Sequence, residues 1–323
     1  MRKLVTRVGQ PLFLDEDVQI AIRDLSQAGT NETLGRVYTR SEIVNFILDL
    51  VGYTPDKPLY EHTILEPSFG AGSFLAPIIE RLIASWRSRA SHDANWLAIK
   101  DSIRAVELHK ATFEETKAKV AEILRAHYAP KDAIEALTNA WLLQGDYLTE
   151  EFENRFDFVV GNPPYIRLEN IPSALLQHYR STFHTMFDRA DIYIPFIEKS
   201  LSLLENGGHL GFICADRWIK NKYGGPLRKF VSEQFHLRAY IGTISSEAFE
   251  SEVSAYPAIF VISTYKEGPT HISHAPRVDA KALKKLSSAI ISNNPMSNDS
   301  EVYEIRSLPK GREPWLLESP ERL

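Results

Sequence analysis

Residues 162–165 read Asn-Pro-Pro-Tyr and directly follow an apolar segment, 156–160, that we expect to be a strand. The two prolines stiffen the backbone at the end of that strand. The side-chain oxygen of Asn162 and the carbonyl oxygen of Pro163 are acceptors suited to the two hydrogens of an exocyclic amine, and Tyr165 offers a face for stacking a planar base. This combination indicates a site that positions a planar amine for attack on an electrophilic methyl group, with no strong base required.

Two glycines follow the first expected strand, 63–66, where the chain turns into a helix expected over 73–86. Gly70 and Gly72 let the backbone approach a ligand closely, and the start of a helix offers free N–H donors. A phosphate group and the carboxylate of a methionine moiety both suit such a turn. The turn lacks the third glycine of the dinucleotide fingerprint, which disfavours an NAD-linked oxidoreductase.

Acidic residues stand at the ends of the next two expected strands. Glu107 closes the apolar run 103–107, where its carboxylate can accept hydrogen bonds from both hydroxyls of a ribose. Asp146 follows the strand 141–144, where its carboxylate can accept a hydrogen bond from an adenine amino group. The simpler alternatives are an exposed charge for Glu107 and a helix cap for Asp146. Three such features at successive strand ends favour a ligand site.

The elements that must position these residues alternate between strand and helix from residue 63 onward. This pattern predicts an α/β fold with a doubly wound, mostly parallel, seven-stranded sheet and helices on both faces. Ligands of such sheets bind beyond the carboxyl ends of the strands. The expected strands are 63–66, 103–107, 141–144, 156–160, 209–215, 237–242 and 258–264, and the expected helices are 16–25, 41–51, 73–86, 110–126, 191–204 and 227–234.

Three regions follow from this pattern. Residues 1–35 form an N-terminal helical extension, 36–265 the catalytic domain, and 266–323 a linker or the start of a further domain, because 286–300 is rich in Ser and Asn. The helix over 41–51 is preceded by Thr39, which has capping-box spacing to the glutamate three residues later.

The overall composition is that of an ordinary soluble protein. Cys214 is the single cysteine, which suits a reducing cytoplasm, and no segment approaches the roughly 20 apolar residues that span a bilayer. We therefore expect a soluble, cytoplasmic protein without membrane contact. The net charge of −5 does not indicate a nucleic-acid binder. A local basic cluster is explained equally well by phosphate contacts or by a solvated helix face; its members are Arg217, Lys220, Lys222, Arg228 and Lys229.

In type and order, these motifs resemble the γ class of DNA amino-methyltransferases, the bacterial adenine-N6 enzymes of restriction–modification systems. The resemblance covers about residues 35–265. It implies that the sheet has the Rossmann-like class I methyltransferase fold and that S-adenosyl-L-methionine is the cofactor. It also implies that the substrate is double-stranded DNA, with methyl transfer to N6 of a flipped-out adenine.

The resemblance also implies residue roles. Residues 35–39, including Thr39, match the element that contacts the methionine end of the cofactor, and Phe196 matches the phenylalanine that covers its adenine. The remaining implied cofactor residues are Glu66, Gly70, Gly72, Glu107 and Asp146, and the implied catalytic residues are Asn162, Pro163 and Tyr165. Phe249 matches a second aromatic that would hold the flipped adenine against Tyr165.

The sequence departs from the family pattern in two places. Arg40 follows Thr39 where many relatives have proline, and the chain ends about where a target-recognition domain would start. The resemblance therefore leaves room for a separate specificity subunit or restriction endonuclease as a partner. Two alternatives remain: a methyltransferase of another planar amine or amide, such as an RNA guanine or a release-factor glutamine, and a cofactor-binding, non-catalytic subunit of a larger modification complex.

Overall fold

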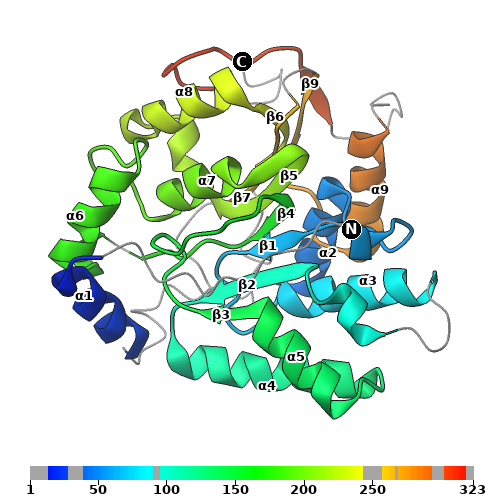
Figure 1. The fold of residues 1–323 in the computed structure, drawn as a ribbon. Helices are drawn as coiled ribbons and strands as arrows, with labels where there is room; N and C mark the ends of the chain where they lie inside the picture. The colour runs from blue at the N-terminus through cyan, green and yellow to red at the C-terminus, as the bar shows by residue number, and fades with distance from the viewer. Residues whose placement is uncertain are drawn as a thin grey trace.

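A mixed sheet runs through the centre of the molecule (Figure 1). The computed structural model describes residues 14–27, 39–89, 95–166, 168–242, 257–265, 268–292 and 302–317. Within these residues the sheet has nine strands, in the order β3 (Leu142–Gln144), β2 (Ile103–Glu107), β1 (Ile64–Glu66), β4 (Phe156–Gly161), β5 (Leu204–Ala215), β7 (Pro257–Ser263), β6 (His236–Gly242), β8 (Thr270–His274) and β9 (Tyr303–Ile305).

The strand pairing confirms the doubly wound, mostly parallel sheet. Strands β3, β2, β1, β4 and β5 pair in parallel, whereas β7 is antiparallel to both β5 and β6. The expected number of seven strands is wrong, because β8 pairs in parallel with β6 and β9 pairs with β8. The sequence Thr-His-Ile-Ser-His of β8 holds a single apolar residue and β9 has three residues, so neither shows the periodicity that identifies a strand.

Helices cover both faces of the sheet (Figure 1). One layer consists of α2 (Ser41–Val51), α3 (Leu75–Arg87), α4 (Lys110–Ala126), α5 (Lys131–Trp141) and α9 (Ala280–Ile291). The other consists of α1 (Glu16–Gln27), α6 (Ser173–Thr182), α7 (Tyr193–Ser202) and α8 (Gly225–Gln234). No helix in the described ranges is long and apolar enough to cross a membrane.

Neighbouring residues of each central strand belong to different cores. In β1, Ile64 packs into the core beneath α2 and α3, whereas Leu65 packs into the core beneath α6 and α7. Val160 and Val159 of β4 divide in the same way. Successive side chains of a strand point to opposite faces, so an unbroken apolar strand serves both helical layers and is buried on both sides.

Two expectations about helices are wrong. The region 286–300 is not a linker throughout, because α9 continues to Ile291. The capping box before α2 does not form: Arg40 is the N-cap residue and no side chain caps the helix. The hydroxyl of Thr39 instead accepts a hydrogen bond from Asn162, 123 residues away in the sequence.

The chain beyond residue 265 continues the same domain. After β9, residues 308–317 run across the layer that contains α8, and the Trp315 side chain is fully buried. Its ring lies 5.4 Å from that of Trp218, edge to face, and its backbone N–H donates to the carbonyl of Ile219 at 3.0 Å. The expected domain boundary at residue 265 therefore does not mark the end of the sheet or of its cores.

Trp315→Ala is expected to lower the free energy of unfolding by about 3–5 kcal/mol, because it removes a large buried ring that its surroundings cannot replace. Chemical denaturation followed by circular dichroism measures the change. Leu316→Ala is the matched control, since Leu316 is 60% exposed and the next residue in the same segment. Equal effects of the two substitutions would show that the segment does not contribute to the core through Trp315.

Candidate active site

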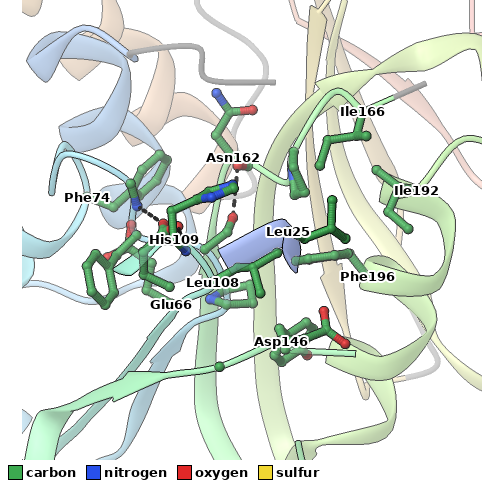
Figure 2. A pocket seen from close by; sticks show the side chains of 18 of the residues that line it. Leu25, Glu66, Phe74, Leu108, His109, Asp146, Asn162, Ile166, Ile192 and Phe196 are labelled. Atoms are coloured by element: carbon green, nitrogen blue, oxygen red, sulfur yellow. Dashed lines mark hydrogen bonds between the residues drawn. The ribbon is translucent and has the colours of Figure 1, made fainter. Parts of the chain in front are cut away.

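A pocket opens at the carboxyl ends of the parallel strands and encloses about 1040 Å³ of open space, its mouth included. Loops that follow β1, β2, β3 and β4 line it, and α1, α6 and α7 contribute further side chains. Seven of the residues predicted from the sequence lie in its wall: Thr39, Glu66, Gly70, Glu107, Asp146, Asn162 and Phe196. In Figure 2, Asn162 stands at one end of the pocket and Asp146 at the other, with Phe196 between them and nearer to Asp146.

The glycine turn after β1 is held in place by Glu107. The Glu107 carboxylate accepts hydrogen bonds from the backbone N–H of Gly70 at 2.9 Å and of His109 at 2.8 Å. Gly70 and Gly72 have φ of 51° and 89°, a left-handed conformation that favours glycine. A Cβ on Gly72 would also approach Thr116 to 3.1 Å. Glu107 is therefore a buried organiser of the turn and not an exposed charge.

The Glu66 carboxylate, at the end of β1, is buried, and hydrogen bonds within the described part of the chain do not satisfy both of its oxygen atoms. Its Oε2 atom has no hydrogen-bond partner among the residues that the structure describes. Burial, reinforced by the charge of Glu107, raises the pKa of Glu66 well above its usual value. A buried acceptor in a pocket wall is costly unless a ligand donates to it. The site therefore suits a ligand with a cationic or hydrogen-donating group at this point.

Asp146 caps a turn and is also part of the pocket wall, and its contact with an adenine amino group stays a prediction. Its Oδ2 atom accepts from the backbone N–H of Thr149 at 3.0 Å, which caps a turn, and the carboxylate also lines the pocket. The hydroxyl of Tyr179 donates a further hydrogen bond to it, from α6. Burial raises the pKa of Asp146. The carboxylate is thus held in one orientation at the end of the pocket opposite Asn162 (Figure 2).

A half-buried lysine, Lys199, holds the loop that carries Asp146. The Lys199 ammonium on α7 donates to the carbonyl oxygens of Tyr147 at 2.6 Å and Leu148 at 3.2 Å, and also to that of Glu150. Burial lowers the pKa of Lys199 to about 8. Nothing in the residues around position 199 marked it as a site residue, since its role depends on α7 packing against a loop about 50 positions earlier.

Asn162 is fixed from two sides at the end of β4. Its side-chain nitrogen donates to the Thr39 hydroxyl at 3.2 Å, and its backbone carbonyl accepts from the Ser68 hydroxyl at 3.2 Å. Thr39 is 3% exposed, so water does not compete for this contact. Because the nitrogen end of the amide faces Thr39, the orientation of its oxygen end is set.

The other predicted site residues lie differently. Pro163 is buried, while Tyr165 is half-buried and packs against the core beneath α7, so neither lines the pocket. Phe196 forms part of the wall, with its ring 5.0 Å from that of Tyr147. Phe249 and residues 35–38 lie outside the described residues. The pocket also contains side chains that the sequence did not single out: Leu25, His109, Ile166, Tyr179 and Ile192.

The fold is that of the class I methyltransferases. A protein of Listeria monocytogenes assigned to the class I S-adenosylmethionine-dependent methyltransferases superposes with a TM-score of 0.57 at 15% identity, covering 84% of this chain and 75% of that one. The methyltransferase subunit of a type I restriction-modification system from Streptococcus thermophilus superposes with a TM-score of 0.60 at 15% identity, covering 83% and 55%.

Sequence comparison defines the family. Residues 74–249, more than half of the chain, match the Eco57I restriction-modification methylase model, and the chain belongs to that family. It is 50% identical over 306 residues to the type II methyltransferase M.PaeR7I of Pseudomonas aeruginosa, covering 95% of this chain and 53% of the relative. It is 44% identical to M.XhoI of Xanthomonas vasicola, covering 90% and 54%. The chain thus spans about half the length of these curated relatives.

Proposed function

We propose that this chain is the catalytic part of a site-specific DNA methyltransferase that transfers a methyl group from S-adenosyl-L-methionine to N6 of an adenine flipped out of double-stranded DNA. The observation that carries the proposal is the orientation of the Asn162 amide at one end of a pocket whose opposite end holds Asp146. The names of the relatives, which are type II methyltransferases, support DNA as the substrate class.

The pocket residues fit the cofactor group by group. Glu66 offers a buried acceptor for the methionine ammonium, and the turn at Gly70 and Gly72 lets the backbone come close to it. Glu107 lies next to this turn, where a ribose would meet its carboxylate, and Asp146 faces the end that would take the adenine amino group. Phe196 supplies an apolar wall there. When bound, the cofactor supplies an electrophilic methyl group.

The chain's own residues act on the amine. The Asn162 side-chain oxygen and the Pro163 carbonyl accept hydrogen bonds from the two amino hydrogens, which favours a pyramidal nitrogen with its lone pair directed into the pocket. The proton leaves after methyl transfer, so no strong base is needed. Tyr165 stacks on one face of the adenine and Phe249 on the other. Base stacking on an aromatic ring contributes roughly 1–3 kcal/mol per base, which offsets the cost of flipping.

Because the relatives are about twice as long as this chain, we propose that sequence recognition uses protein outside these residues. That protein is a further part of the same polypeptide or a separate specificity subunit. We propose a restriction endonuclease as a further partner of the chain in the cell.

Asn162→Ala is expected to reduce methyl transfer at least about 100-fold, because it removes an acceptor that acts on the reacting nitrogen. Binding of S-adenosylmethionine, measured by calorimetry, is expected to persist. The assay follows tritium transfer to DNA, RNA and protein, and mapping of N6-methyladenine in DNA of an expressing host identifies the site. Label found solely in RNA or protein, or activity retained in the variant, would contradict the proposal.

Thr39→Val is expected to lower kcat by roughly tenfold, because the Asn162 amide loses the contact that fixes its orientation. Thr39→Ser keeps the hydroxyl and is expected to retain most of the activity. The KM for DNA is expected to stay unchanged in both variants, since Thr39 lies in the wall of the cofactor pocket and acts on the amine through Asn162. If Thr39→Ser were as impaired as Thr39→Val, the hydroxyl would not be the group that matters.

Cofactor binding is expected to strengthen as pH rises toward the pKa of Glu66 in the free pocket. That pKa is raised by burial and by Glu107, so Glu66 is protonated at the lower end of the range, whereas a bound ammonium favours its ionised form. Binding below that pKa therefore releases a proton. Calorimetry in buffers of different ionisation enthalpy measures the release. Glu66→Gln is expected to abolish it, and identical proton release in this variant would assign the release to another group.

A further inference from the structure

Two segments about 90 residues apart carry exposed cations to one surface. The first is residues 216–224, which follow β5 and contain η4 (Asp216–Ile219) and η5 (Lys222–Gly224), and the second is residues 310–313, after β9. Their exposed basic residues are Arg217, Lys220, Lys222, Lys310 and Arg312. We call these five residues the basic surface.

A buried arginine joins the two segments. Arg228 of α8 is 2% exposed, and its guanidinium donates to the carbonyl oxygens of Trp218 and Asn221 in the first segment, the latter at 2.9 Å. The same guanidinium donates to the carbonyl oxygens of Arg312 and of Glu313, the latter at 2.8 Å. Each of these acceptors is a backbone carbonyl, so Arg228 acts as a clamp between the segments.

Two further contacts bring the cations close together. The Trp315 N–H donates to the Ile219 carbonyl at 3.0 Å, next to Lys220. A Cβ placed on Gly225 would lie 3.3 Å from the Cβ of Arg312, which puts the root of the Arg312 side chain against the first turn of α8. The basic surface is thus a product of tertiary packing. A solvated face of a single helix, the alternative that the sequence left open, does not account for cations that converge from two segments.

The basic surface flanks the pocket. In the sheet, β5 lies beside β4, and Gly161, which precedes Asn162, pairs with Phe212. Strand β5 ends three residues later at Ala215, so η4 begins about 10 Å further along the strand direction, at 3.3 Å per residue. Tyr223 of η5 is also tied to α7, through a 2.9 Å hydrogen bond to the hydroxyl of Tyr193.

The nearby acids are engaged within the protein. Asp216 accepts a hydrogen bond from the Tyr240 hydroxyl at 3.0 Å, and Asp191 faces Arg217 and accepts from Tyr223. Glu313 remains exposed at the edge of the basic surface. The cations of the basic surface outnumber Asp191, Asp216 and Glu313, so the local charge is positive although the chain as a whole carries −5.

We propose that the basic surface binds the phosphate backbone of duplex DNA beside the flipped adenine. This inference rests on the proposed function and names the side chains that carry the electrostatic part of DNA binding. Phosphate contacts position a duplex without reading its sequence, so they do not require knowledge of the recognition site. Their signature is a steep dependence of affinity on salt concentration.

The test compares two charge-neutralised triple variants. Arg217→Gln/Lys220→Gln/Lys222→Gln removes the cations of the first segment. Arg125→Gln/Lys131→Gln/Lys281→Gln removes three exposed cations from α4, α5 and α9, in the other helical layer (Figure 1). Fluorescence anisotropy with a 30-base-pair duplex over a series of KCl concentrations gives the affinity and the salt slope. Thermal denaturation checks that both variants fold as the parent chain does.

The first variant is expected to bind DNA at least tenfold more weakly at low salt, with a plot of log K against log[salt] less steep by about 2–3. Its affinity for S-adenosylmethionine and its kcat at saturating DNA are expected to equal those of the parent chain. Lys310→Gln/Arg312→Gln is also expected to weaken DNA binding and to make the salt dependence less steep. The control variant is expected to leave the DNA affinity and the salt slope unchanged.

Equal affinity and slope in the first variant and the parent chain would overturn the assignment of the surface, and so would an equal loss in the control. These outcomes are separable from failure of the proposed function, which is judged on the parent chain by methyl transfer to DNA. A parent chain that methylates DNA while the variants bind normally would retain the enzyme and reject the basic surface. A parent chain with no DNA binding would reject both.

Discussion

One residue, Glu107, ties together the loops on which the pocket depends. Its carboxylate accepts from the backbone of Gly70 after β1 and of His109 after β2, and its own carbonyl accepts from Gly145 before Asp146. Three strand ends are thereby held at fixed positions by a single buried acid. Since parallel strands bring their carboxyl ends to one edge of the sheet, this linkage turns separate loops into one wall.

Burial gives the remaining polar contacts their effect. Thr39 and Asn162 meet away from water, the Lys199 ammonium is surrounded by carbonyl oxygens, and Glu66 retains an acceptor without a partner among the described residues. Polar groups shielded from water hold their geometry more strictly than exposed ones, and an uncompensated one favours binding of a complementary ligand. The pocket thus holds the Asn162 side chain in a fixed orientation, and it presents the Glu66 carboxylate to a ligand as a hydrogen-bond acceptor.

The central part of the fold was predictable because its strands carry a strong local signal. Runs such as residues 158–161 are apolar throughout, and the helices between the strands show a clear 3.6-residue pattern. Helices α5, α6 and α9 and strands β8 and β9 were not predicted. β8 has a single apolar residue, and α6 buries just Leu175 and Tyr179, so the stability of both comes from the neighbours they pack against.

The sequence by itself determined the type of sheet and the residues at its strand ends, Glu66, Glu107, Asp146 and Asn162, because strand periodicity and motif spacing are local properties. The tertiary structure decided which groups hold them: Tyr179 on Asp146, Thr39 on Asn162, and Arg228 between the two basic segments. In the sequence, Tyr179 is 33 positions from Asp146 and Thr39 is 123 positions from Asn162. Contacts of that range depend on how helices and loops pack, which no local pattern encodes.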